Sequence, residues 1–170
     1  MIPQLPLMSY EHISYICSQF KNEAGEAMFE YGCGGSTMFF SRYVDLYRSV
    51  EHDSDWYRLM TEKVPRNVQI FLKEPLGKPI HPFGPGDVER QQEYINAIHM
   101  DNMFYDYILI DGRCRVECAK QAVSHMNENS LLYVHDYERV KYHPIEKFLK
   151  LKEKRIHSGD HRVLACFSLK

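Results

Sequence analysis

The sequence predicts a doubly wound α/β fold built around a mainly parallel sheet. Short apolar runs alternate along the chain with amphipathic segments of about ten residues, and this spacing favours strands joined by crossover helices. Several of the apolar runs end in glycine or in an acid, as strands do where they give way to a turn. Two expected strands at the C-terminal end of the chain, KRIHSG and RVLACFSL, depart from the alternation, and they predict a β-hairpin.

The first half of the chain shows the alternation plainly. Strands are expected at 27–32, 46–53 and 68–74, and helices at 9–20, 36–44 and 54–64. Ser9 is placed to cap the first helix, because a hydroxyl there can accept a hydrogen bond from a free amide. Ser54 or Asp55 is placed to cap the third helix, and Pro65 closes it.

The second half repeats the pattern after an irregular stretch. Residues 75–87 hold four prolines and three glycines, which predicts a long loop without regular structure. Helices are then expected at 88–100, 115–127 and 143–153, and strands at 105–112, 130–138, 154–159 and 162–169. The last two strands form the expected hairpin, which turns around Gly159 and Asp160.

Composition favours one domain over residues 1–170, in which residues 1–25 form an N-terminal helical segment. The chain is 44% hydrophobic and 26% charged, so it is long enough and apolar enough to bury a sizeable core. The net charge is -2, which argues against a dedicated nucleic-acid binder, because such a protein needs a basic face. No apolar run approaches the roughly 18 residues of a membrane span, so we expect no membrane partner.

Cysteine usage indicates a reducing compartment. The chain has five cysteines, an odd number, and no CxxC pair. Cys114 and Cys118 are four residues apart on an expected helix, but no second pair completes a zinc site. We therefore expect buried free thiols. The N-terminal stretch lacks the basic region of a signal peptide, and together these features predict a cytoplasmic protein.

A glycine-rich turn follows the first expected strand. The stretch reads EYGCGGST from Glu30 to Thr37, with glycine at 32, 34 and 35. In doubly wound sheets, ligands bind at the carboxyl ends of the central strands, and glycine lets the backbone approach them closely. Thr37 stands where the third glycine of a GxGxxG motif would be, which weakens the case for a pyrophosphate-binding NAD oxidoreductase. The plain alternative is a strand-to-helix turn that merely needs small residues.

Two acids accompany this turn and favour a particular ligand. Glu30 ends the first strand and is placed to accept a hydrogen bond from an ammonium group. Glu51 ends the next strand about 20 residues on, where an acid commonly holds the hydroxyls of a ribose. One acid for an amine and one for a ribose fits S-adenosylmethionine.

Four stretches in this order resemble the motifs of class I S-adenosylmethionine-dependent methyltransferases. They are EYGCGGST, SVEHDSDWY, LIDGR and YVHDYERV, which span about residues 27–150. The second and fourth are similar to sugar-modifying members, of the glucuronoxylan 4-O-methyltransferase and macrocin O-methyltransferase types. The resemblance implies a Rossmann-like, seven-stranded sheet whose last strand is antiparallel. The cofactor-binding residues are expected to be Glu30, Tyr31, Gly32, Gly34, Gly35, Ser36, Thr37, Glu51, His52 and Asp111.

The expected chemical centre lies at two further strand ends. Asp111 ends the strand at 105–112, and His135 and Asp136 lie in the strand at 130–138. The resemblance to macrocin-type enzymes implies that these three residues hold Mg²⁺, although His135 stands where an aspartate would be and would suit Mn²⁺ equally. We expect His135 or Asp136 to act as general base, with or without a metal. The alternatives are that Asp111 only caps a helix and that His135 is a core histidine.

The predicted activity is S-adenosylmethionine-dependent O-methylation of a carbohydrate hydroxyl, in a free sugar or a glycan. The alternatives are O-methylation of a phenol or another small metabolite and a nucleotide-binding module without turnover. Arg113 and Arg139 are candidates for binding the cofactor carboxylate or the acceptor, or are merely solvated. The loop at 75–87, with His81 and Phe83, is expected to act as an acceptor lid or as a contact between copies in a homo-oligomer.

Overall fold

The computed structural model describes residues 4–77, 88–159 and 161–170, and it confirms the predicted α/β fold. The strands are β1 (Ala27–Tyr31), β2 (Leu46–Glu51), β3 (Val68–Leu72), β4 (Tyr107–Ile110), β5 (Leu131–Val134), β6 (Lys150–Ile156) and β7 (Val163–Ser168). They form one seven-stranded sheet in the order β3-β2-β1-β4-β5-β7-β6. β1 to β5 pair in parallel, whereas β7 is antiparallel to both β5 and β6. The predicted antiparallel last strand is thus confirmed.

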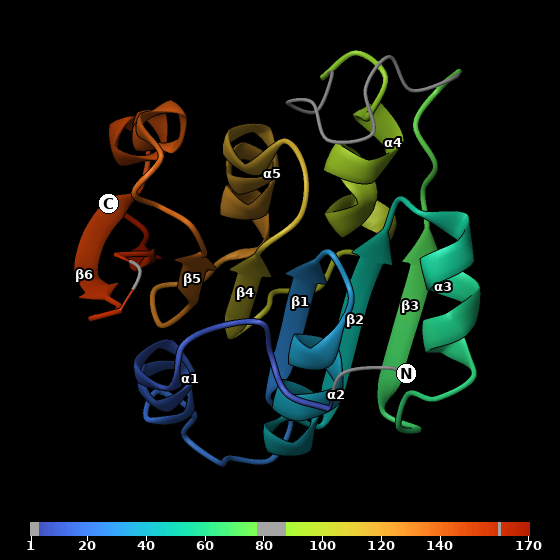
Figure 1. The fold of residues 1–170 in the computed structure, drawn as a ribbon, viewed down its shortest axis with the longest axis horizontal. Coiled ribbons are helices and arrows are strands. Elements are labelled where there is room, and N and C mark those ends of the chain that lie inside the picture. The colour runs from blue at the N-terminus through green and yellow to red at the C-terminus, as the bar shows by residue number, and fades with distance from the viewer. Residues whose placement is uncertain (1–3, 78–87, 160) are drawn as a thin grey trace.

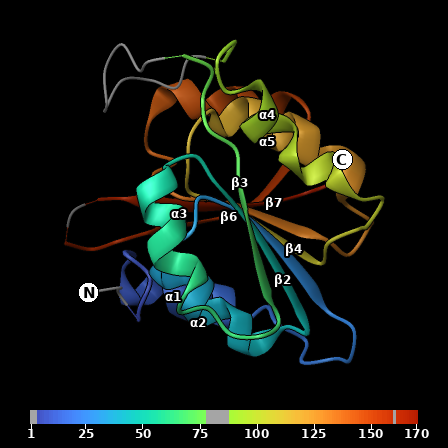
Figure 2. The ribbon, with the colours of Figure 1, turned by 90° about the vertical axis from the view of Figure 1, so that its right-hand side faces the viewer.

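Helices cover both faces of the sheet. The α-helices are α1 (Tyr10–Cys17), α2 (Gly35–Phe40), α3 (Ser54–Thr61), α4 (Gln92–Ile95) and α5 (Arg115–Ala122). The 3-10 helices are η1 (Ser41–Tyr43), η2 (Asn96–Met100), η3 (Val123–His125) and η4 (Val140–Lys147). Figures 1 and 2 show α1, α2 and α3 on one face and α4 and α5 on the other. Each face buries its own apolar cluster, so the sheet is the middle of three layers.

The sheet order places a crevice beside its central strand. The chain moves outward from β1 to β2 and β3, and then returns to β4 on the other side of β1. The carboxyl ends of β1, β2 and β4 therefore meet at one edge of the sheet, which is the upper edge in Figure 1. Ligands of doubly wound folds bind at this switch point.

Two helix caps illustrate how local sequence sets these elements. The Ser9 side chain accepts a hydrogen bond from the His12 amide at 3.2 Å, which confirms the expected cap of α1. For α3 the prediction of Ser54 or Asp55 is wrong by one or two residues. Asp53 is the cap, and its Oδ1 accepts from the Trp56 amide at 2.9 Å.

The helix expected at 143–153 is not formed. The chain instead forms η4 and then enters β6 at Lys150. Pro144 lies inside η4, and it has no amide to donate to a longer α-helix. Beyond it, Leu151 and Glu153 are partly buried between exposed neighbours, which is strand periodicity. The β6–β7 pairing confirms the predicted hairpin, although Asp160 lies outside the described residues.

Other elements are shorter than predicted. The helix expected at 88–100 is confined to α4 followed by η2. The strand expected at 130–138 ends at Val134, and Asp136 then adopts a left-handed φ of 55°. Most of the loop expected at 75–87, including His81 and Phe83, lies outside the described residues. Within the described ranges, no helix is long and apolar enough to span a bilayer.

Candidate functional site

A cavity of about 940 Å³ opens at the switch point of the sheet. Its walls come from the turn after β1, the end of β2, the turn after β4, the first turns of α5 and the start of η4. Ligand pockets of proteins measure about 300–1,000 Å³, so this cavity lies near the upper end of that range.

The glycine turn forms one wall of the cavity, as the sequence predicted. Gly32, Gly34, Gly35 and Ser36 all line it. Gly32 has a φ of +95°, and a Cβ added to it would lie 3.1 Å from the Cα of Gly112. The turns after β1 and β4 are therefore packed backbone to backbone. A Cβ added to Gly34 would meet no atom within 4 Å, so this glycine leaves open space at the cavity wall.

Gly35, which lines the cavity, also has a second role that the sequence does not predict. A Cβ added at Gly35 would overlap the backbone carbonyl of Leu5. This glycine therefore admits the N-terminal segment of residues 4–8, and Leu7 from the same segment lines the cavity. No sequence pattern indicates this contact, because it joins residues 30 positions apart through the backbone of Leu5.

Glu51 lies where the sequence predicted, at the end of β2 and on the cavity wall. Its Oε2 accepts from the Cys33 amide at 3.1 Å, and its Oε1 accepts from the amides of His52 and Asp53 at 2.8 and 2.9 Å. Burial alone would raise the pKa of Glu51, but hydrogen bonds from His52 and from these amides outweigh it and lower the pKa. The cavity therefore keeps a carboxylate that is charged at neutral pH.

His52 extends this arrangement to the neighbouring turn. Its Nδ1 lies 2.7 Å from Glu51 Oε1, and its Nε2 accepts from Arg113 Nε at 3.3 Å. Trp56 lines the same wall, and its indole donates to the Cys33 carbonyl at 2.8 Å. The ends of β2 and β4 are thus linked across the crevice by side chains.

Three residues expected to bind the cofactor do not reach the cavity. The Glu30 side chain is fully buried and accepts hydrogen bonds from Ser36, from Thr37 at 2.5 Å and from Tyr47 at 2.9 Å. Burial raises the pKa of Glu30 to about 8, although these hydroxyls oppose the shift. Tyr31 points into the core, where its hydroxyl donates to the Ile95 carbonyl. The expected contact of Glu30 with an ammonium group is therefore replaced by support of the glycine turn from behind, and Thr37 shares that role.

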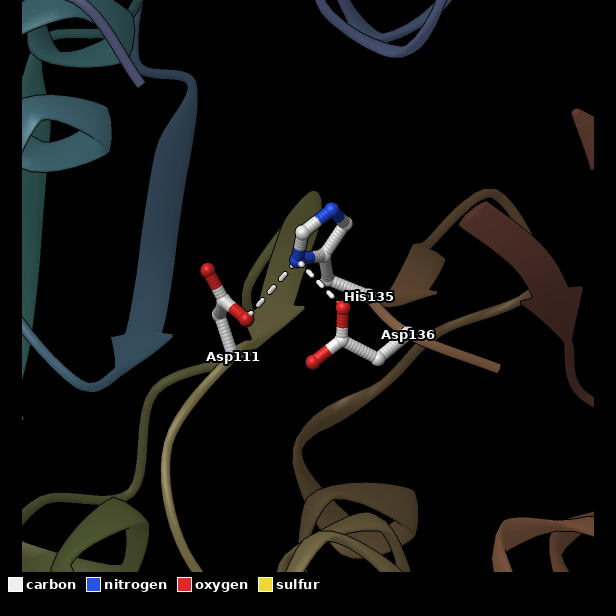
Figure 3. A group of neighbouring side chains, drawn as sticks. All are labelled: Asp111, His135 and Asp136. Atoms are coloured by element: carbon white, nitrogen blue, oxygen red, sulfur yellow. Dashed lines mark hydrogen bonds and ion pairs between the residues drawn. The ribbon is translucent and has the colours of Figure 1, made fainter. Parts of the chain in front are cut away.

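Asp111, His135 and Asp136 come together as the sequence predicted (Figure 3). His135 Nδ1 donates to Asp111 Oδ1 at 3.0 Å and lies 3.6 Å from Asp136 Oδ1. Of the three, Asp111 lines the cavity, with 27% of its side chain exposed. His135 is only 2% exposed, and its Nε2 points away from the carboxylates in Figure 3.

The far side of His135 faces the N-terminal helix. The His12 ring lies edge-on to it, with 5.6 Å between the ring centroids. His12 Nε2 donates to the Arg155 carbonyl at 2.9 Å, and burial together with the nearby His135 lowers the pKa of His12. His135 is therefore held between α1 and Asp111, with no direct exposure to the cavity.

Arg115 organises this cluster, although it was not among the expected site residues. Its Nη2 lies 3.2 Å from Asp111 Oδ1 and 3.2 Å from Asp136 Oδ2. The same guanidinium donates to the backbone carbonyls of Asp111, Gly112 and His135. The only signal in the sequence was a basic residue at the start of the helix after IDGR, which is not distinctive by itself.

The cluster was expected to hold a divalent metal, and its geometry argues against one. One ligand atom from each of Asp111, His135 and Asp136 lies within 4.8 Å of the others. The buried Arg115 guanidinium already lies 3.2 Å from both carboxylates, however, and would repel a second cation placed between them. The donor set as it stands therefore does not fit Mg²⁺ or Mn²⁺.

Comparisons with known proteins agree with the fold. No protein-family model matches the sequence, and no curated protein matches it. A methyltransferase-like protein from Silicibacter pomeroyi DSS-3 has a TM-score of 0.65 at 23% identity, covering 98% of this chain and 90% of that chain. An rRNA methylase from Streptococcus thermophilus has a TM-score of 0.62 at 9% identity, covering 96% and 99%. The TYW2 protein of M. jannaschii, solved with AdoMet, has a TM-score of 0.53 at 13% identity, covering 97% and 79%.

These neighbours show the fold of the chain and do not identify a methyl acceptor. None of the three is described as modifying a sugar, so the expected closeness to sugar O-methyltransferases is not supported. The sheet has the strand order given above, with an antiparallel last strand. The structural agreement with the first of these neighbours extends over nearly the whole chain. The chain therefore has the Rossmann-like fold of class I S-adenosylmethionine-dependent methyltransferases.

Proposed function

We propose that this protein is an S-adenosylmethionine-dependent O-methyltransferase acting on a carbohydrate or another small hydroxylated acceptor. The observation that carries the proposal is that one cavity is lined by the glycine turn, by the charged Glu51 and by Asp111. A cofactor site and a proton acceptor thus open into the same space. The volume of about 940 Å³ supports two ligands side by side.

The cofactor half is the wall formed by the glycine turn and the end of β2. Gly34 leaves open space there, and Glu51 offers a charged acceptor to a ribose. His52 and Trp56 complete the wall. When bound, S-adenosylmethionine supplies a methyl group activated by its positively charged sulfur. Glu30, Tyr31 and Thr37 support this wall from behind.

Asp111 is the residue that we assign to the acceptor hydroxyl. As the acceptor oxygen forms its bond to the methyl carbon, the carbon–sulfur bond breaks and the hydroxyl proton passes to Asp111. His135, which donates to the other side of this carboxylate, orients it, and Arg115 fixes both. The general base expected at His135 or Asp136 is thus reassigned to Asp111, because Asp111 is the member of the cluster on the cavity wall.

The test is methyl transfer from isotopically labelled S-adenosylmethionine to sugars and phenols. Asp111→Asn should lower kcat by about a hundredfold, while calorimetry shows S-adenosylhomocysteine affinity close to that of the wild type. Asp55→Asn, at an exposed position of α3 outside the cavity, is the matched control and should keep full activity. An active Asp111→Asn enzyme would remove Asp111 from the reaction. Cofactor binding without transfer to any acceptor would instead favour a nucleotide-binding module.

Metal dependence is tested in the same assay. Because Arg115 occupies the position between the two carboxylates, we expect full activity in EDTA and no gain from Mn²⁺ or Mg²⁺. Loss of activity in EDTA with recovery in Mn²⁺ would show that a metal ion, and not Arg115 alone, acts between these carboxylates.

A further inference from the structure

The half of the cavity beyond Asp111 carries an excess of cationic side chains. Its walls are α5 and the start of η4, and they bring Lys120, Arg139 and Lys141 to the cavity. Among the described residues of α5 and η4 that line the cavity, the one acid is Glu117, one turn before Lys120. Arg115 and Arg139 are already paired with carboxylates, so the excess positive charge of this wall comes from Lys120 and Lys141. The whole chain has a net charge of -2.

The two lysines of this wall are not engaged by acids. Among the described residues, no carboxylate lies within ion-pair distance of Lys120 or Lys141. Arg139 does pair with Asp136 at 3.1 Å and with Glu138 at 3.8 Å, but half of its side chain remains exposed. The positive charge of the wall is therefore available to a ligand.

Tyr142 gives the wall a fixed shape. Its ring is buried, with Lys141 Nζ 5.1 Å from the ring centroid and the Arg115 guanidinium carbon 5.2 Å from it. The ring is thus held by two cations, one of which also holds Asp111. Tyr142 therefore contacts Lys141 directly, and through Arg115 it is linked to the proposed proton acceptor Asp111.

We propose that the acceptor carries an anionic group, a carboxylate or a phosphate, which Lys120, Arg139 and Lys141 bind while its hydroxyl lies at Asp111. This inference rests on the proposed function and narrows its acceptor class. A neutral acceptor would leave the cationic wall without a counter-charge. We infer a small molecule and not a polynucleotide, because Lys120, Arg139 and Lys141 all line the same cavity as Asp111.

Nuclear magnetic resonance of the ¹⁵N-labelled protein tests the proposal without knowledge of the natural acceptor. The probes are inorganic phosphate, 3-hydroxybenzoate and its neutral counterpart 3-hydroxybenzamide, each titrated with and without S-adenosylhomocysteine. We expect each anion to shift the backbone amide signals of Lys141 and Tyr142 saturably. The affinity of 3-hydroxybenzoate should be about tenfold higher than that of 3-hydroxybenzamide. The anion that saturates the shift at the lower concentration shows whether the site prefers a phosphate or a carboxylate.

Variants locate the binding. Lys141→Gln and Lys120→Gln should each weaken anion binding about tenfold and leave 3-hydroxybenzamide unaffected. Lys63→Gln is the matched control, because Lys63 is exposed after α3 and outside the cavity. Equal affinity for the benzoate and the benzamide, or no saturable shift from either anion, would overturn the proposal. So would a short RNA that binds more tightly and shifts amides well outside the cavity.

The two proposals fail in different ways. Absence of S-adenosylhomocysteine binding would contradict the proposed function. The anion titration of the free protein would still measure whether the cationic wall binds an anion. Cofactor binding with methyl transfer only to neutral acceptors sinks the anionic class and leaves the methyltransferase intact.

Discussion

Glu51 is buried and yet charged, and that combination makes it the residue on which cofactor affinity should depend. Its carboxylate accepts three backbone amides, which compensate for the loss of water. A sulfonium nucleoside is positively charged and carries ribose hydroxyls, so it gains both attraction and hydrogen bonds at this position.

Glu51→Ala should weaken S-adenosylhomocysteine binding by about ten- to a hundredfold. Glu51→Gln, which keeps an acceptor oxygen for the amides, should lie between this variant and the wild type. Calorimetry measures both, with the exposed Glu23→Ala as control. Unchanged affinity in Glu51→Ala would exclude Glu51 from the cofactor site.

Glu30 is the opposite case, because its burial raises its pKa to about 8. The folded protein keeps this proton up to about pH 8, whereas the unfolded chain loses it near the ordinary value of 4.5. Folding therefore takes up a proton between these values, and the free energy of unfolding falls as the pH rises through this window.

Glu30→Gln removes that proton uptake. Relative to the wild type, the variant should gain stability from pH 5 to pH 8, on the order of 1 kcal/mol per pH unit. Above pH 8 the difference should level off. Urea denaturation at four pH values measures it, with exposed Glu23→Gln as control. A stability difference that stays constant across pH would show that Glu30 is ionised in the folded protein.

At the scale of elements, the N-terminal segment of residues 4–8 lies against the glycine turn. The Leu5 carbonyl fits against Gly35 because Gly35 has no side chain, and Leu7 joins the cavity wall. One glycine of the turn thus serves the protein's own chain, while Gly34 leaves space for a ligand.

Gly35→Ala and Gly34→Ala should therefore have reciprocal effects. Gly35→Ala should speed amide hydrogen exchange in residues 4–8, because its methyl group overlaps Leu5. Gly34→Ala should leave this exchange unchanged and weaken S-adenosylhomocysteine binding, because its methyl group projects into open space. Equal protection of residues 4–8 in the two variants would contradict the packing described here.

The elements that sequence predicted best are those in which each strand carries its own signal. β1, β2 and β4 are buried apolar runs that end in a glycine turn or an acid, and their ends are within a few residues of the prediction. The prediction for the region after Pro144 is wrong, because an edge strand made mostly of charged residues has no apolar face strong enough to reveal its period. Its strand character comes from pairing with β7, a contact that local sequence does not contain.

The sequence predicts the part of the candidate site that comes from the ends of strands. It does not predict the residues that reach the site from helices. Asp111, His135 and Asp136 end neighbouring parallel strands, so topology alone brings them together. Arg115 holds two of these side chains from a helix, and Lys141 and Tyr142 reach the cavity from η4, which was not predicted. The burial of Glu30 depends in turn on α2 folding back over β1.

At the scale of the whole molecule, the doubly wound sheet gathers all these features at one edge. The glycine turn, Glu51 and Asp111 come from three different strands and line one cavity. Lys120, Arg139 and Lys141 line the same cavity. In the proposed function, Glu51 binds the cofactor and these cations bind the acceptor.

The most direct measurement is calorimetric titration of S-adenosylhomocysteine and of NADH into the purified protein. We predict saturable binding of S-adenosylhomocysteine with one site per chain, weakened in Glu51→Ala, and no saturable binding of NADH. Binding of NADH in its place, or no heat from S-adenosylhomocysteine at millimolar concentrations, would contradict the assignment of this cavity to a sulfonium nucleoside.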